Sequence, residues 1–138
     1  MAETFEAFMK RRAAAALAYV QGDGAPVEEL STENQPASFF GPGGGVVEGA
    51  AAMRKAFADG AKSFEPVGES QLEIIASAAD EHLAFWTGIQ RATVKFRGAE
   101  MQTPMNLRIT EMFRREAGEW KLTHRHADLL KAEVAATR

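Results

Sequence analysis

The chain has 138 residues, enough for one globular domain with an apolar core but too few to leave much room for a second. Its 16 basic and 19 acidic residues give a formal net charge of −3, which argues against nucleic acid or an anionic membrane as a partner. Cysteine is absent, which excludes disulfides, thiolate catalysis and cysteine-bound metals. The absence of cysteine is compatible with the reducing cytoplasm, which is the location that we expect.

The first half of the sequence predicts three helices and a small hairpin. Apolar residues at helical spacing indicate a first helix, which the glycines around Asp23 bring to an end. Pro26 favours the start of a short second helix. Two short apolar strands then flank a glycine-rich turn. The predicted elements are helix 1–21, helix 26–30, strands 37–40 and 46–47, and a helix from 50 to about 64.

The second half alternates between apolar and polar residues, which is the period of β-strands. Turn signals separate the strands, and such short connections require antiparallel neighbours because parallel pairing needs a long crossover. Helices followed by a strand meander predict a single α+β domain over residues 1–138. The predicted strands cover residues 71–78, 82–96, 102–115 and 120–128.

The order of these elements and three local strings resemble a known group of proteins. The strings are FFGPGGGVVEG (39–49), LRITEMFRR (107–115) and GEWKLTHRHAD (118–128). They are similar to the SnoaL-like and ketosteroid-isomerase-like branch of the nuclear transport factor 2-like superfamily. The resemblance implies a cone-shaped, cystatin-like fold, in which a strongly bent, mainly antiparallel sheet packs on three N-terminal helices around a pocket. It also implies homodimers, usually formed through the outer sheet face. No organic cofactor is predicted.

The residues that carry ketosteroid isomerase chemistry in that superfamily do not occur at the matching positions. The mechanism needs a carboxylate base and an oxyanion hole built from a tyrosine and a neutral aspartic acid. Gly41 stands where the base would precede Pro42, and Ala15 stands in the tyrosine slot. Thr110 stands in the slot of the neutral acid. Steroid isomerisation by that mechanism is therefore not expected.

The string His124-Arg125-His126-Ala127-Asp128 is the first candidate for chemistry. Side chains alternate along a strand, so His124, His126 and Asp128 should share one face, and Trp120 and Leu122 have the same parity. That face is expected to be the covered one. An imidazole there could act as an acid or base. The pair could also bind zinc if Asp128 or Glu111 supplied a third ligand, or it could be structural. We predict catalytic roles for His126 and His124 and no metal.

Arg108 is the third predicted catalytic residue, because it lies between Leu107 and Ile109 in an apolar strand. A guanidinium can hold the carboxylate or phosphate of a ligand in a bidentate pair. It could equally form a structural ion pair, with Glu73 or Glu111 as partner.

Aromatic and methionine residues could line a pocket, although the same residues also build ordinary cores. The predicted ligand-binding residues are Phe40, Phe57, Trp86, Met105 and Thr110. The predicted function is binding of a small hydrophobic or anionic organic molecule, with an isomerase, cyclase or hydrolase activity as an extension. The alternative is a non-catalytic module for dimerisation or protein interaction, and fold alone does not decide between the two.

Overall fold

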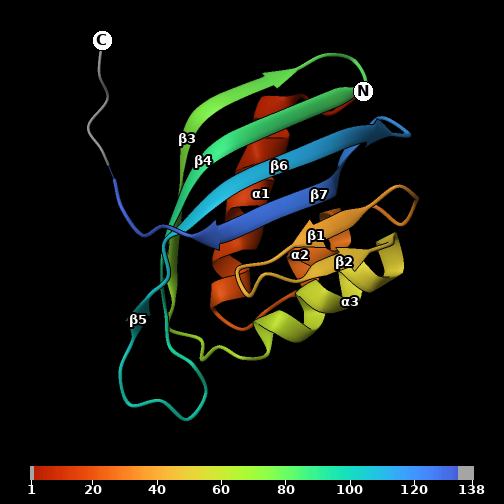
Figure 1. Ribbon diagram of the computed structural model, residues 1–138. Coiled ribbons are helices and arrows are strands. Elements are labelled where there is room, and N and C mark those ends of the chain that lie inside the picture. The colour runs from red at the N-terminus through yellow and green to blue at the C-terminus, as the bar shows by residue number, and fades with distance from the viewer. Residues whose placement is uncertain (1, 134–138) are drawn as a thin grey trace.

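The computed structural model describes residues 2–133, in which three helices pack on one curved sheet (Figure 1). The sheet has the order β2-β1-β7-β6-β4-β3, and β5 pairs with β4 outside this order. The four long strands form the predicted antiparallel meander. The α+β class and the bent sheet on three helices are confirmed. The elements are α1 (Phe5–Val20), α2 (Ala25–Leu30), β1 (Ser38–Phe40), β2 (Val46–Glu48), α3 (Ala50–Ala61), β3 (Glu69–Ala79), β4 (Leu83–Val94), β5 (Thr103–Pro104), β6 (Leu107–Glu116) and β7 (Glu119–Leu129).

Helix α1 lies against the inner face of the sheet and supplies much of the core. The side chain of Thr4 caps its first turn by accepting a hydrogen bond from the backbone N–H of Ala7 at 3.1 Å. Phe8 is fully buried and meets the ring of Phe113 on β6 edge to face at a centroid distance of 5.0 Å. Within residues 2–133, neither α1 nor another helix is long and apolar enough to cross a membrane.

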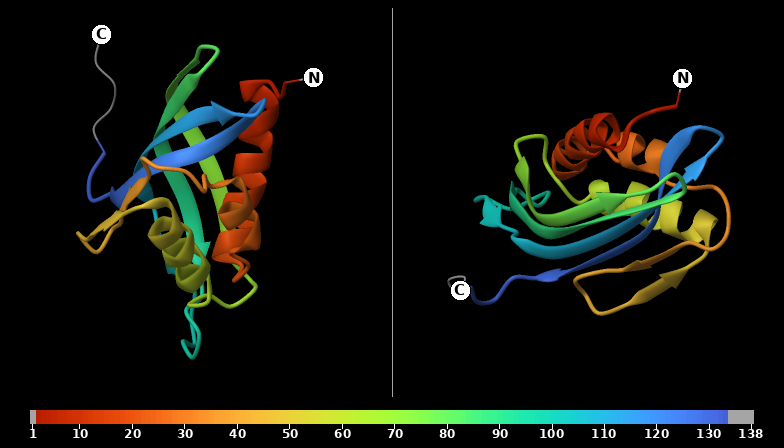
Figure 2. Two further views of the ribbon diagram at one scale, coloured as in Figure 1. Left: turned by 90° about the vertical axis from the view of Figure 1, so that its right-hand side faces the viewer. Right: turned by 90° about the horizontal axis from the view of Figure 1, so that it is seen from above.

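The sheet curls around the helices, and Figure 2 shows this curvature from two sides. One cause is a β-bulge in β3 between Ile74 and Ala76, because an extra residue on one strand bends and twists the pair. Gly88 of β4 lies opposite the bulge, where a Cβ atom would overlap the backbone carbonyl oxygen of Glu73. Glycine is therefore needed at this position so that the two backbones can approach.

A second bulge, at Thr123 in β7, decides which face each later residue of the strand occupies. Phe113 of β6 pairs with Leu122, but the preceding Met112 pairs with His124, so Thr123 is the extra residue. The prediction that His124, His126 and Asp128 share one face is confirmed, but the prediction that this face is the covered one is wrong. Trp120 and Leu122 point into the core, whereas His124 and His126 point to the outer face. The alternation rule fails here because one inserted residue inverts the parity of the rest of the strand.

The hairpin of β1 and β2 extends the sheet through a pairing that the sequence did not predict. Strand β1 runs parallel to β7, with Ser38 opposite His124 and Phe40 opposite His126. Because successive strand residues face opposite sides, Phe39 points to the interior and Phe40 to the outer face.

The strand predicted over residues 102–115 is divided into β5 and β6. Between them Met105 donates its backbone N–H to Ala92, and the side chain of Asn106 accepts the N–H of Ala92 at 3.2 Å. The preceding Pro104 has no N–H to continue the ladder, which accounts for the break.

Candidate functional site

A cavity of about 180 Å³ lies between the helices and the inner face of the sheet, and we call it the interior cavity. Its wall is mostly apolar and includes Phe39 and Phe57. Its polar lining residues are Arg12, Tyr19, Gln90 and Arg125. Sites for drug-sized ligands usually measure about 300–1,000 Å³, so this cavity suits a smaller molecule.

Three charged side chains meet beside the cavity and form what we call the buried triad: Arg12 of α1, Glu111 of β6 and Arg125 of β7. Arg12 donates from Nε and Nη2 to the two carboxylate oxygens of Glu111 at 2.9 and 2.7 Å. Arg125 Nη1 donates to Oε2 of the same carboxylate at 2.7 Å, and Trp86 Nε1 donates to Oε1 at 2.7 Å. The side chains of the triad are 3%, 0% and 11% exposed in chain order, so these contacts are shielded from water.

The two guanidinium groups keep Glu111 ionised. Burial alone would raise its pKa, but the charges of Arg12 and Arg125 and their hydrogen bonds lower the pKa of Glu111 to about 2. Burial lowers the pKa of Arg125, and the carboxylate of Glu111 opposes that effect. A guanidinium nevertheless stays protonated in proteins. Two positive charges and one negative charge give the triad a net charge of +1.

One hydrogen-bond donor of the triad is left without a partner in the described part of the chain. Within residues 2–133, the buried Nη1 of Arg12 has no hydrogen-bond partner. Arg125 Nη2 donates to Oε1 of Gln90 at 2.9 Å, and the amide nitrogen of Gln90 donates to Ser70 Oγ at 3.1 Å. Burial raises the pKa of Tyr19, whose ring also lines the cavity, while the charges of Arg125 and Arg12 oppose that rise.

The predicted ligand-binding residues are divided between different parts of the molecule. Phe57 and Met105 line the interior cavity, and their role in ligand binding stays a prediction. Trp86 is fully buried but is absent from the wall, because its indole packs in the core and binds Glu111. Phe40 and Thr110 lie on the outer face, where the hydroxyls of Thr110 and Thr87 are 2.9 Å apart.

The predicted catalytic residues also lie on the outer face, away from the cavity. Arg108 forms a bidentate pair with Asp128, its cross-strand neighbour, with distances of 2.6 and 2.7 Å. This is the structural ion pair considered above, with a different acid as partner. His126 lies beside the same pair, and its side chain is 51% exposed.

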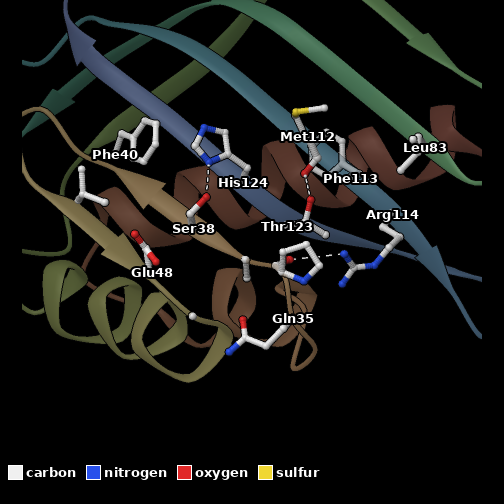
Figure 3. A pocket seen from close by; sticks show the side chains of 14 residues that line it. Gln35, Ser38, Phe40, Glu48, Leu83, Met112, Phe113, Arg114, Thr123 and His124 are labelled. Carbon is white, nitrogen blue, oxygen red and sulfur yellow. Dashed lines mark hydrogen bonds between the residues drawn. The ribbon is translucent and has the colours of Figure 1, made fainter.

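His124 borders an open groove of about 860 Å³ between the β1–β2 hairpin and the outer sheet face (Figure 3). Its Nδ1 is 2.8 Å from Ser38 Oγ, and Phe40 packs edge-on against it at a centroid distance of 4.7 Å. Partial burial lowers the pKa of His124, the charge of His126 lowers it further, and the contact with Ser38 opposes the shift. These contacts fit a structural role in holding the hairpin.

The zinc alternative needed Asp128 or Glu111 as a third ligand, and Asp128 is held in a bidentate pair by Arg108. Glu111 points into the interior and is saturated by two arginines, whereas His124 and His126 lie on the opposite sheet face. Residues 2–133 contain no group of three or more histidine and acidic side chains placed to hold a metal ion.

The family model described as a SnoaL-like domain matches residues 9–129. The chain belongs to the SnoaL-like domain family. Among solved structures, this SnoaL-like domain is similar to a candidate dehydratase of the nuclear transport factor 2-like family from Streptomyces avermitilis, with 20% identity over 92% of this chain and 96% of that chain and a TM-score of 0.77. It is also similar to a candidate calcium/calmodulin-dependent protein kinase type II association domain from Thiobacillus denitrificans, with 17% identity over 95% of this chain and 98% of that chain and a TM-score of 0.70.

A third similar structure is a ketosteroid isomerase-like protein from Erwinia carotovora atroseptica, with 15% identity over 90% of this chain and 94% of that chain and a TM-score of 0.69. At these identities the likeness shows the fold of the SnoaL-like domain and not its activity. No curated protein sequence matches the chain significantly.

The buried triad was not recognised from the sequence, although signals for it exist. Arg12 lies four residues after Phe8 and four before Ala16, in the middle of the apolar stripe of the first helix. Glu111 lies between the apolar residues Ile109 and Phe113 at the buried parity of its strand. A charged residue at a core position requires a partner of opposite charge, so the two could have been paired. Arg125 could not, because the bulge at Thr123 is what turns it inward.

Proposed function

We propose that this SnoaL-like domain binds a small organic molecule in the interior cavity. The observation that carries the proposal is the coexistence of aromatic walls with a few convergent polar groups in one hollow of about 180 Å³. Phe57 is 2% exposed and Phe39 packs on it at a ring-centroid distance of 5.0 Å, so the wall is built by well-packed side chains.

Binding is better supported than proton-transfer catalysis. The titratable groups nearby are poorly matched to acid–base work near neutral pH, since Glu111, which lies behind the arginines of the wall, has a pKa of about 2, and burial raises the pKa of Tyr19. An isomerase, cyclase or hydrolase activity would have to rely on Tyr19 as a donor or on charge stabilisation by the arginines. We therefore place recognition of the ligand first and treat catalysis as an extension of it.

The experiment is a thermal-shift screen of small organic molecules against the wild type and a variant with a filled cavity. Ala16 lines the cavity and is 2% exposed, so Ala16→Leu should fill the space that a ligand would use. A compound at about 100 times its Kd stabilises the wild type by about 2.7 kcal/mol and should leave Ala16→Leu unshifted. The control is Ala14→Leu, at an exposed position of the same helix.

Two results would contradict the proposal: no compound stabilises the wild type, or stabilising compounds act equally on Ala16→Leu. Ala127→Val offers a second filled cavity, from the strand side, if Ala16→Leu does not fold.

A second candidate function is self-association through the outer sheet face. Apolar side chains are exposed there, with Ile75 at 71%, Leu83 at 55% and Met112 at 45% exposure. Exposed apolar patches on a sheet are typical of protein interfaces. We propose that a second copy of the chain covers this face, which the candidate association domain of the same fold also favours.

A further inference from the structure

We infer that the ligand of the interior cavity is a small apolar carboxylate, and that its negative charge binds beside Arg12 and Arg125. The inference rests on the proposed function and narrows it to one chemical class. It starts from an imbalance of charge in the cavity wall, which contains two guanidinium groups and no carboxylate.

The imbalance is not corrected inside the triad. Glu111 neutralises one guanidinium, and Arg12 already occupies both of its oxygens in a bidentate pair. The other contact of Arg125 in residues 2–133 is the neutral amide of Gln90. A buried charge without a counter-charge is strongly unfavourable, so the site gains most from a ligand that brings one negative charge.

The geometry also provides a donor for that charge. Arg12 is 2% exposed and lines the cavity, and its Nη1 is the nitrogen without a partner among the described residues. Nε and Nη2 are fixed on Glu111, so the guanidinium plane and the direction of Nη1 are held in place. Nη1 is buried, so a ligand oxygen reaches it only after a small shift of the cavity wall; it can then donate a charge-assisted hydrogen bond while Nε and Nη2 stay on Glu111.

A carboxylate fits better than a phosphate on charge and on size. The single net positive charge of the triad matches a monoanion, whereas a phosphate dianion would leave the buried site negative. Most of the other lining side chains, such as Phe57 and Leu107, are apolar, so the rest of the ligand should be apolar as well. Benzene occupies an engineered cavity of about 150 Å³ in another protein, so an aromatic acid or a short fatty acid is the appropriate size.

The competing explanation is that Arg125 is purely structural and only ties β7 to Glu111. The two explanations differ in the charge dependence of binding. A purely structural arginine does not distinguish an acid from the amide of the same shape, whereas an anion site does.

The test measures Kd by isothermal titration calorimetry for short monocarboxylates, with benzoate and hexanoate as first members, and for their amides. Each acid should bind the wild type about 10- to 100-fold more tightly than its amide, the size of a charge-assisted hydrogen bond. Arg125→Gln removes the excess charge but keeps the bidentate pair of Arg12 and Glu111, and should abolish the preference. Arg125→Lys should restore part of it. Arg108→Gln, on the outer face, is the matched control and should behave as the wild type.

Equal affinity of acids and amides would overturn the inference and leave the proposed function standing. Acids that keep their preference in Arg125→Gln and in Arg12→Gln would also overturn it, because they bind elsewhere. If neither acids nor amides bind, and no compound separates the wild type from Ala16→Leu, the proposed function fails with it. Circular dichroism establishes that each variant is folded, and Arg12→Gln replaces Arg125→Gln if the latter is not. Inorganic phosphate should bind no more tightly than the amides.

Discussion

Replacing Glu111 by glutamine should destabilise the protein by about 3 kcal/mol at neutral pH. Glutamine has nearly the shape of the protonated acid, so the change approximates protonation of a buried carboxylate. The pKa of Glu111 falls from 4.5 to about 2 in the folded protein. Each pKa unit corresponds to about 1.4 kcal/mol, which gives about 3 kcal/mol for this shift. Removal of one partner from a buried ion pair costs about 3–5 kcal/mol in other proteins, which agrees.

The assay is urea unfolding at pH 7, with the free energy of unfolding taken from the midpoint and slope. Glu73→Gln is the matched control, because Glu73 also pairs with an arginine, Arg91, but its side chain is 54% exposed. That change should lower the free energy of unfolding by less than about 1 kcal/mol. If Glu111→Gln costs no more than Glu73→Gln, the triad does not stabilise the fold in the way described.

The difference in free energy of unfolding between the wild type and Glu111→Gln should also depend on pH. The pKa of Glu111 is lower in the folded than in the unfolded chain, so its contribution is complete above about pH 4.5 and is lost as the pH falls toward 2. The difference in free energy of unfolding between wild type and Glu111→Gln should therefore shrink over this range. A difference that stays constant down to pH 3 would contradict the assignment of the low pKa.

Two further changes test the sheet. Gly88→Ala should lower the free energy of unfolding by about 1–3 kcal/mol or more in the same urea titration, because the added Cβ would overlap the backbone carbonyl of Glu73. Gly43→Ala is the control and should be nearly neutral, because no atom lies within 4 Å of the added carbon. Met112→Lys should convert the proposed dimer to a monomer, as measured by light scattering. Met101→Lys changes a 77% exposed residue outside the strands and should leave the dimer intact. A monomeric wild type would refute the outer-face interface.

Local patterns were sufficient to predict most of the fold. The apolar stripe of α1 and the alternation in β6 indicate which side chains face the core, and Phe8 and Ile109 are buried as these patterns predict, whereas β4 carries apolar residues on both faces. The parallel pairing of β1 with β7 is a contact between distant segments, for which a short strand such as Ser38–Phe40 gives no local signal.

The candidate site was harder to predict than the fold, because its location depends on one residue. Alternation assigned His124 and His126 to the covered face, and the bulge at Thr123 places them outside and turns Arg125 inward. Bulges have no reliable sequence signature, so the parity of every residue after one is uncertain from sequence alone. Of the predicted ligand-binding residues, Phe57 and Met105 line the cavity, whereas Phe40 and Thr110 lie on the outer face, because residue type alone does not indicate which face of a strand a side chain occupies.

Because of the backbone irregularity at Thr123, strand register as well as residue identity determines which side chains line the interior cavity. With that residue present, a guanidinium is presented to the interior and two imidazoles to the exterior. Loss of a single residue there would exchange the two sets and replace a permanent cation by groups that titrate near neutral pH. Relatives that share this fold could therefore differ in the reaction they support through a one-residue deletion, with every functional side chain retained.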